Sequence, residues 1–195
     1  MAEARKRDVI VIGASAGGVE ALMRLFQELP TGMAAALFVV LHTAPTGQSR
    51  LPQILNRQGP LPAHFAEDQE RVNFGEIYVA PSNRHLMLEH RKVLVTSAPK
   101  ENRNRPAINP LFRTAAEAYG PRVIGVILTG LLDDGTAGLW EIKRRGGITV
   151  VQSPEDAAYP EMPQNAIANV EVDHVVALHD MADLLISLCQ CEADL

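Results

Sequence analysis

The residue best suited to do chemistry in this chain is Ser15, which stands in the glycine-rich turn G-A-S-A-G-G after an apolar run at residues 9–12. A short β-branched run is typical of a buried parallel strand, and a G-x-S-x-G turn between strand and helix pushes the serine Oγ out of the backbone. The first N–H groups of the following helix point to the same place and favour negative charge there. The motif therefore favours Ser15 as a nucleophile.

The same turn has a second interpretation, because glycine-rich strand-to-helix turns also bind dinucleotide phosphates. A dinucleotide-binding fold places an acidic residue at the end of its second strand, where the acid holds the ribose hydroxyls. Here the apolar run at residues 37–41 ends in His42, and the spacing of Gly13, Gly17 and Gly18 departs from G-x-G-x-x-G. We therefore rank nucleotide binding below nucleophilic catalysis and expect no thermal shift with nicotinamide or flavin cofactors.

Further reactive side chains follow other apolar runs. His42 follows residues 37–41, and T-G-L-L-D-D-G, which contains Asp133 and Asp134, follows residues 123–128. Open α/β sheets bind ligands beyond the carboxyl ends of their strands, so these groups are expected to meet at one edge. A serine, an imidazole and a carboxylate are the three groups that a serine hydrolase uses.

Each of these residues also has a purely structural explanation. A serine at a strand end is often a helix cap, and an Asp-Asp-Gly sequence is often a turn with capping acids. From the residues alone, the choice between Asp133 and Asp134 stays open. The order serine, histidine, acid differs from that of the α/β-hydrolases, whose histidine comes last, so a lipase-type fold is not expected.

The elements that position these residues alternate between short apolar runs and amphipathic stretches, which is the pattern of βα units. This pattern predicts the α/β class, with a doubly wound, mostly parallel sheet and helices on both faces. Strands are predicted at residues 9–12, 37–41, 63–66, 123–128, 148–151 and 174–178. Helices are predicted at residues 18–28, 48–57, 109–119, 136–145, 163–169 and 181–189.

Residues 76–96 interrupt this rhythm. Three runs, at residues 76–80, 85–90 and 92–96, are predicted to be antiparallel strands of an inserted or edge hairpin, with a tight turn at residues 89–91. The polar, proline-containing stretch 98–109 predicts an exposed loop. Its composition fits a solvated connector and a substrate-facing loop equally well.

Composition limits the function classes. A chain of 195 residues with 47% hydrophobic and 21% charged residues predicts a single domain over residues 1–195, and a net charge of −5 argues against a nucleic-acid partner. Without a signal peptide or a long apolar run, we expect a cytoplasmic protein with no membrane insertion. Two cysteines, Cys189 and Cys191, are too few for a zinc site, and the six histidines lack ligand spacing, so we expect free thiols and no metal.

The chain resembles the catalytic domain of the chemotaxis protein-glutamate methylesterases, the CheB type, over about residues 9–185. The matching segments are G-A-S-A-G-G at 13–18, the strand-end His42, I-Y-V-A-P-S-N-R-H-L at 77–86, L-F-R-T-A-A at 111–116, L-T-G-L-L-D-D-G-T-A-G-L at 128–139, G-G-I-T-V-V-Q at 146–152 and M-P-Q-N-A-I at 162–167. So many blocks in the same order make chance similarity improbable.

The resemblance implies a role for each site residue. Ser15 would be the nucleophile, His42 the general base and Asp134 the orienting carboxylate, with the backbone N–H groups of Ala16 and Leu131 holding the oxyanion. The implied reaction is hydrolysis of γ-glutamyl methyl esters on the cytoplasmic helices of chemoreceptors, which releases methanol. Deamidation of glutamine at similar sites is implied as a side activity, and no cofactor is implied.

The chain departs from the family pattern at three places. The family usually has threonine after the nucleophile, methionine and glycine after T-G, and Q-H-M around the histidine, whereas this chain has Ala16, Leu131 with Leu132, and Leu41 with Thr43. We expect these changes to retune substrate placement or rate. They also keep open an alternative class, a non-catalytic signalling module that binds a receptor or a methyltransferase.

Family members commonly carry an amino-terminal receiver domain that blocks the site until it is phosphorylated. This chain begins eight residues before its first strand. The expectation is therefore either a free-standing member controlled by a partner, such as a methyltransferase or a separate receiver protein, or an excised domain.

Overall fold

The computed structural model describes residues 6–42, 49–191 and 193. Its central feature is a seven-stranded sheet with the order β3-β4-β2-β1-β7-β8-β9, in which every strand pair is parallel. The strands are β1 (Val9–Ala14), β2 (Ala36–Leu41), β3 (Ala63–Phe65), β4 (Ile77–Val79), β7 (Val123–Ile127), β8 (Ile148–Gln152) and β9 (His174–Val176). The doubly wound α/β class predicted from the sequence is confirmed.

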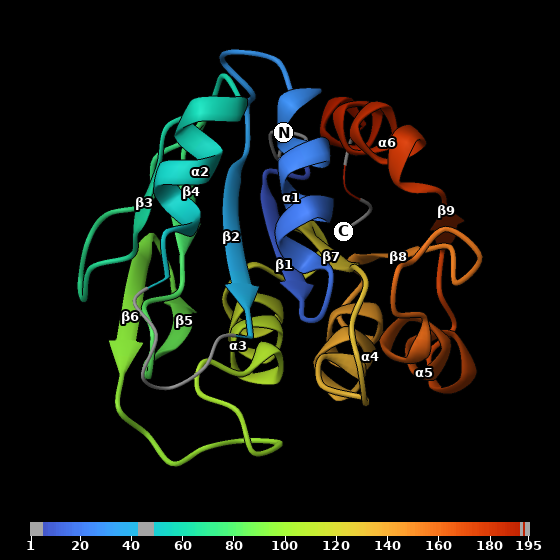
Figure 1. Cartoon of the computed structure of the whole chain (residues 1–195). Helices are drawn as coiled ribbons and strands as arrows, with labels where there is room; N and C mark the ends of the chain where they lie inside the picture. Colours follow the sequence, from blue (N-terminus) through green and yellow to red (C-terminus); the bar gives the residue numbers. More distant parts are fainter. Residues whose placement is uncertain (1–5, 43–48, 192, 194–195) are drawn as a thin grey trace.

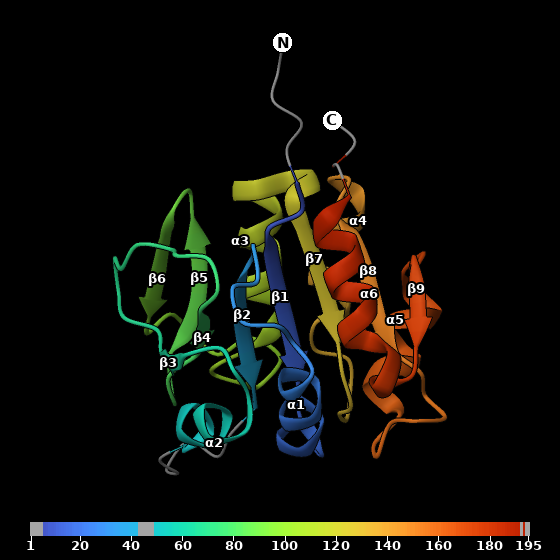
Figure 2. The ribbon, with the colours of Figure 1, turned by 90° about the horizontal axis from the view of Figure 1, so that it is seen from above.

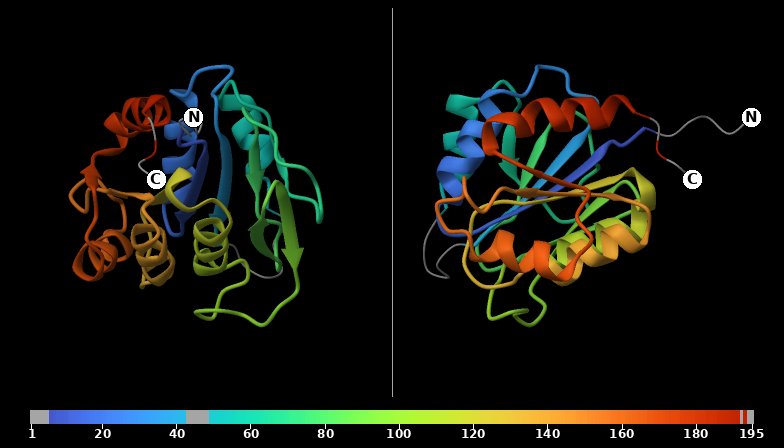
Figure 3. Two further views of the ribbon diagram at one scale, coloured as in Figure 1. Left: turned by 180° about the vertical axis from the view of Figure 1, so that it is seen from behind. Right: turned by 90° about the vertical axis from the view of Figure 1, so that its right-hand side faces the viewer.

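Helices cover both faces of this sheet (Figures 1 and 3). One face carries α1 (Gly18–Gln27), α2 (Leu51–Gln58) and α6 (Leu178–Gln190), and the other carries α3 (Ile108–Tyr119), α4 (Thr136–Arg144) and α5 (Glu161–Asn169). A short 3-10 turn, η1 (Gly120–Arg122), leads from α3 into β7. Two separate apolar cores result, one on each side of the sheet.

The strand β1 shows why these residues form a central strand. All six residues of V-I-V-I-G-A are buried, as expected for a parallel strand covered by helices on both faces. Its side chains alternate between the two cores, with Ile10 and Ile12 on one side and Val9 and Val11 on the other. This period of two is the geometry of an extended chain.

The sheet brings three strand ends together. The strand β1 pairs with β2 and β7 on either side, with Ala14 opposite Leu41 and Gly13 opposite Ile127. Beyond these pairs, the His42 N–H donates to the Ala14 carbonyl oxygen at 3.1 Å. Because the chain winds outward in both directions from β1, this point is the topological switch of the sheet, where open α/β folds bind ligands.

The prediction of three antiparallel strands at residues 76–96 is wrong in one part. The strand β4 (Ile77–Val79) pairs in parallel with β2 and β3 inside the main sheet, and only β5 (His85–Glu89) and β6 (Lys92–Thr96) pair antiparallel. The three residues of β4 are all buried, and such a short apolar run carries no signal of strand direction. The hairpin itself lies against α3 (Figure 2), where the Leu88 N–H donates to Thr114 Oγ1 at 3.0 Å.

Several boundaries also differ from the predicted ones. The last strand ends at Val176, and α6 begins at Leu178, three residues earlier than expected. The helix α5 begins at Glu161, two residues before the predicted start at Pro163. A proline is tolerated anywhere in the first turn of a helix, so its position does not mark the first residue. The helix α2 begins at Leu51, and the predicted start at residue 48 lies outside the described residues.

Candidate active site

The structure brings Ser15, His42 and Asp134 into one hydrogen-bonded series. The Oγ of Ser15 lies 3.1 Å from Nδ1 of His42, and Nε2 of His42 lies 2.8 Å from Oδ2 of Asp134. An ionised carboxylate only accepts hydrogen bonds, so the network assigns the proton of the neutral ring to Nε2. The lone pair of Nδ1 then faces the serine hydroxyl, which donates to it.

The carboxylate of Asp134 is the most heavily bonded group of the site. Its residue is 1% exposed. Beyond the imidazole, its oxygens accept hydrogen bonds from the N–H of Ile108 at 2.7 Å, of Gly135 at 3.0 Å and of Asn109 at 3.3 Å, and from Nδ2 of Asn102 at 3.0 Å. These donors fix both oxygens, so the carboxylate cannot turn away from the imidazole.

The same donors determine the charge of Asp134. Burial raises the pKa of its carboxyl, but the hydrogen bonds from His42, Ile108 and Asn102 and the charge interaction with His42 together outweigh burial, so the pKa is lowered from its ordinary value. The group is therefore ionised at neutral pH. Asp133, the neighbouring acid, is exposed, and its side chain lines a cleft beside the site. Of the two adjacent acids, Asp134 is the one that contacts His42.

The turn that carries Ser15 depends on two glycines. Gly17 has a φ of +75°, in the left-handed region that favours glycine. Gly130, in the loop after β7, packs so closely that a Cβ atom built on it would lie 2.8 Å from the Cβ of Ser15. A hydrogen bond of 3.0 Å from the Ser15 N–H to the Thr129 carbonyl oxygen holds the two loops together. The position of the serine is therefore set by its neighbours as well as by its own turn.

The backbone N–H groups of Ala16 and Leu131 lie in these two loops. Within the described part of the chain, neither N–H donates a hydrogen bond to another group. Thr129 Oγ1 fixes the first loop by donating to the Ala16 carbonyl oxygen at 3.0 Å, and it accepts from the Tyr159 N–H at 2.9 Å. Among the described residues, both N–H groups are therefore left without an acceptor.

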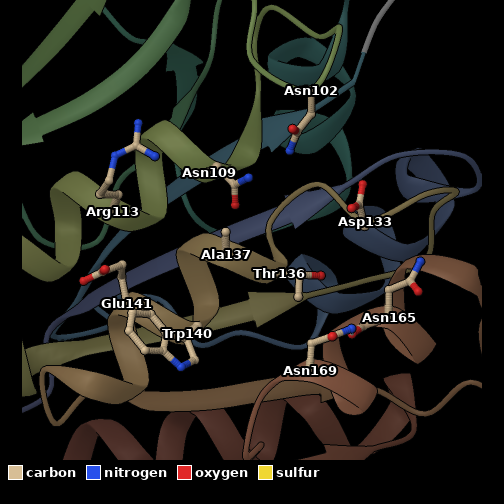
Figure 4. A pocket seen from close by; sticks show the side chains of 10 residues that line it. All are labelled: Asn102, Asn109, Arg113, Asp133, Thr136, Ala137, Trp140, Glu141, Asn165 and Asn169. Atoms are coloured by element: carbon tan, nitrogen blue, oxygen red, sulfur yellow. The ribbon is translucent and has the colours of Figure 1, made fainter.

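A cleft of about 640 Å³ opens next to the carboxylate, between α3, α4 and α5 (Figure 4). Two of its lining residues, Asn102 and Asn109, are donors to Asp134, so the cleft adjoins the hydrogen-bonded series. The lining is Asn102, Asn109, Arg113, Asp133, Thr136, Ala137, Trp140, Glu141, Asn165 and Asn169. Four amide side chains and the charged groups of Arg113, Asp133 and Glu141 offer hydrogen-bonding atoms in this cleft, beside the exposed ring of Trp140.

Sequence reasoning did not find the asparagines of this site. Asn102 lies in the loop between β6 and α3, which ends at residue 107, since residues 108 and 109 of the predicted loop belong to α3. The composition of the predicted loop fits a connector as well as a functional loop. The loop is held in place by the Arg113 guanidinium, which forms a bidentate pair with Glu101 at 3.0 and 3.1 Å. Asn165 and Asn169 share one face of α5 at a spacing of four residues, a signal that also describes an ordinary solvated face.

Other expectations concern groups outside this series. Among the described residues, no cluster of three or more histidine, cysteine or acidic side chains is close enough to hold a metal ion. Cys189 and Cys191 are free thiols, and burial raises the pKa of Cys189 to about 11. Within the part of the chain that the structure describes, no helix combines the length and apolar character needed to cross a membrane.

The fold and the site define a class of protein: a doubly wound α/β protein in which a hydroxyl, an imidazole and a carboxylate stand in series at the switch point of the sheet. The CheB methylesterase family model matches residues 10–185. The chain belongs to the CheB methylesterase family.

Individual relatives agree with this membership. A putative protein-glutamate methylesterase/protein-glutamine glutaminase of Leptospira interrogans is 40% identical over 94% of this chain and 95% of its own length. The protein-glutamate methylesterase/protein-glutamine glutaminase of Pectobacterium atrosepticum is 37% identical over 92% of this chain, which spans only 52% of that relative. The crystal structure of the Thermotoga maritima CheB methylesterase catalytic domain has a TM-score of 0.89 and 32% identity, covering 94% of this chain and 100% of that one.

Proposed function

We propose that this protein is a protein-glutamate methylesterase that hydrolyses γ-glutamyl methyl esters on the cytoplasmic helices of chemoreceptors and releases methanol. Deamidation of glutamine at similar positions is proposed as a second activity, since the relatives carry both names. The observation that carries the proposal is the series Ser15–His42–Asp134, with contacts of 3.1 and 2.8 Å. A substrate on the cytoplasmic part of a receptor places the enzyme in the cytoplasm.

In the first step, Nδ1 of His42 takes the hydroxyl proton of Ser15 as Oγ attacks the ester carbonyl carbon. The tetrahedral oxyanion accepts hydrogen bonds from the N–H groups of Ala16 and Leu131. The C–O bond to methanol then breaks, and His42 returns its proton to the leaving methoxide oxygen. A glutamyl ester of Ser15 remains.

In the second step, water cleaves this intermediate. Nδ1 of His42 takes a proton from the water as its oxygen attacks the acyl carbon, and the bond to Ser15 Oγ breaks with return of the proton to Oγ. The products are a free glutamate side chain and the restored enzyme. This chemistry requires no cofactor.

Asp134 supports both steps without exchanging a proton. Its contact with Nε2 keeps the neutral ring of His42 in the tautomer whose Nδ1 is a base, and its negative charge stabilises the imidazolium formed in each step. A positioned base contributes a factor of about 10²–10⁴ and an oxyanion donor about 10²–10³. A methyl ester is more reactive toward a nucleophile than an amide is, so these two factors give a useful acceleration of its hydrolysis.

Methanol release tests the proposal directly. The wild-type protein should release methanol from a purified, methylated cytoplasmic fragment of a chemoreceptor, and Ser15→Ala should abolish the release because no hydroxyl remains to attack. Ser187→Ala, a serine exposed on α6, is the matched control and should retain full activity. Retained release in Ser15→Ala would remove the serine from the mechanism, and fragment binding without release by the wild type would favour a non-catalytic signalling module.

A further inference from the structure

Leu132, in the loop between β7 and α4, stands in an unusual backbone conformation. Its φ is +67°, in the left-handed region that a bulky side chain rarely adopts. Its side chain is not buried in compensation, since the residue is 56% exposed. Neither backbone preference nor packing in the core accounts for a leucine at this position.

Neighbouring groups hold the loop in this conformation. The carbonyl oxygen of Leu132 accepts a hydrogen bond of 2.8 Å from Nδ2 of Asn165. Two residues earlier, the Gly130 N–H donates to the Tyr159 carbonyl oxygen at 2.9 Å, and the Gly130 oxygen accepts from the Met162 N–H at 3.0 Å. A leucine is thus kept at the surface in a strained conformation, and such strain is concentrated at functional sites.

The loop runs along the reacting groups. Its first residue, Gly130, packs against the Cβ of Ser15, and its fifth residue, Asp134, contacts the ring of His42. Leu132 is the middle residue of this five-residue stretch. Leu132 therefore lies on a loop whose two ends contact the reacting groups, and its side chain is exposed.

Other exposed apolar side chains lie on the same loop and on the segment bonded to it. Leu131 is 46% exposed, and Tyr159, whose backbone is bonded to Gly130, is 44% exposed. Single exposed apolar residues are common and need no explanation. Three of them on two hydrogen-bonded segments beside a hydroxyl and an imidazole indicate a contact surface for a partner. We call Leu131, Leu132 and Tyr159 the apolar rim.

We propose that Leu132 is a specificity-determining residue, whose side chain packs against an apolar side chain of the protein substrate next to the methylated glutamyl group. The inference deepens the proposed function and rests on it. The occupant is a segment of substrate protein, because the rim is continuous with the cleft: Asn165, which lines the cleft, donates to the Leu132 carbonyl oxygen. A surface that runs from the loop beside Ser15 into this cleft fits a length of polypeptide. The apolar rim thus supplies the apolar contact beside the ester.

The kinetic signature of such a contact is a change in KM. The contact is made equally in the bound substrate and in the transition state, so its loss raises KM and leaves kcat unchanged. Removing one leucine side chain from an apolar contact is expected to raise KM about tenfold. A small ester without a neighbouring apolar side chain gains nothing from the contact.

Two variants of Leu132 separate the side chain from the backbone. Leu132→Asn removes the apolar group, and asparagine tolerates the left-handed conformation. Leu132→Met keeps an apolar side chain of similar size. Phe74→Asn removes another exposed apolar side chain, 55% exposed in the segment between β3 and β4, and is the distant control.

The test measures methanol release from a methylated receptor fragment and from N-acetylglutamate γ-methyl ester. We expect Leu132→Asn to raise KM for the fragment about tenfold, with kcat for the fragment and kcat/KM for the small ester unchanged. Leu132→Met and Phe74→Asn should match the wild type on both substrates. An unchanged KM for the fragment in Leu132→Asn, or equal losses on both substrates, would overturn the proposal.

A variant of the substrate completes a double-mutant cycle between Leu132 and the residue that it is proposed to contact. The fragment is chosen to carry an apolar residue next to the methylated glutamate. Replacing that residue by serine should raise KM for the wild type and have no further effect in Leu132→Asn. Additive effects of the two changes would contradict a direct contact. If the wild type hydrolyses neither the fragment nor the small ester, the proposed function itself fails, and this result differs from every outcome that concerns Leu132 alone.

Discussion

The backbone N–H of Ile108 donates a 2.7 Å hydrogen bond to Oδ2 of Asp134, the same oxygen that accepts the hydrogen bond from Nε2–H of His42. Ile108 is the first residue of α3, so the carboxylate lies at the positive end of a helix. Backbone N–H groups thus help to orient the acid, together with the side chains of Asn102 and His42. Two consequences follow for this residue, one for rate and one for stability.

Asp134→Asn is expected to lower kcat by about 10⁴, by analogy with the serine proteases. An amide offers Nδ2–H groups as well as an oxygen, and a neutral side chain neither holds the Nε2–H tautomer of His42 nor stabilises the imidazolium. Methanol release at saturating substrate measures the effect. Asp133→Asn is the matched control and should retain nearly full activity, because Asp133 is exposed and does not contact the imidazole. A greater loss in Asp133→Asn would reverse the assignment of the two acids.

Asp134 should also make stability depend on pH in the acid range. Its pKa is lowered in the folded protein, so the unfolded chain binds its proton more readily. The stabilisation is fully present above the unfolded pKa, about 3.9, and is lost as the pH falls through the lower folded pKa. Urea unfolding between neutral pH and pH 3 should show this loss in the wild type and a shallower dependence in Asp134→Asn. Equal slopes for the two proteins would contradict the lowered pKa.

Asn102→Gly is expected to lower kcat about tenfold, the value of one hydrogen bond to a charged group. Asn102 has a φ of +48°, so glycine keeps the backbone conformation and removes only the amide that binds Asp134. Arg103→Gly is the control, since Arg103 lies in the same loop with a φ of +66° and is exposed. Loss of activity in both variants to the same extent would show that the loop backbone, and not the amide, matters.

Gly130→Ala is expected to reduce kcat strongly, because the added Cβ would lie 2.8 Å from both the Cβ of Ser15 and Cε of Met162. Either Met162 or Ser15 must move to relieve this overlap, and a displaced Ser15 would no longer be placed for attack. Gly32→Ala is the contrasting variant: Gly32 has a φ of +76° but nothing within 4 Å of an added Cβ. It should lower the melting temperature and leave kcat unchanged. Full activity in Gly130→Ala would show that the side chain of Met162 moves to make room and that Ser15 stays in place.

The central part of this fold was predictable because its signals are local. The apolar runs of β1, β2 and β7 are buried on both faces, and the residues that follow them meet at one sheet edge by the rules of parallel sheets. The antiparallel assignment of residues 76–80 failed because the partner of a short buried run is decided by distant packing. The three buried residues of β4 would suit a parallel or an antiparallel strand equally well.

The site was predictable only where its residues follow strands. Ser15 and His42 come directly after β1 and β2, and the spacing of the strands places them together. Asn102 carries no such signal, since its amide reaches Asp134 across 32 positions through a loop that Arg113 anchors. The choice of Asp134 over Asp133 likewise depends on which acid faces Ile108, a tertiary contact that the sequence does not encode locally.

The strands β2, β1 and β7 are adjacent in the sheet, yet they come from opposite halves of the chain. A nascent polypeptide that has emerged from the ribosome only as far as the hairpin already carries the hydroxyl and the imidazole, but it lacks the third group and the strand that delivers it. Esterase activity therefore requires synthesis at least as far as Asp134 and closure of the sheet around β1. A nascent chain that ends before this point lacks the carboxylate that orients His42.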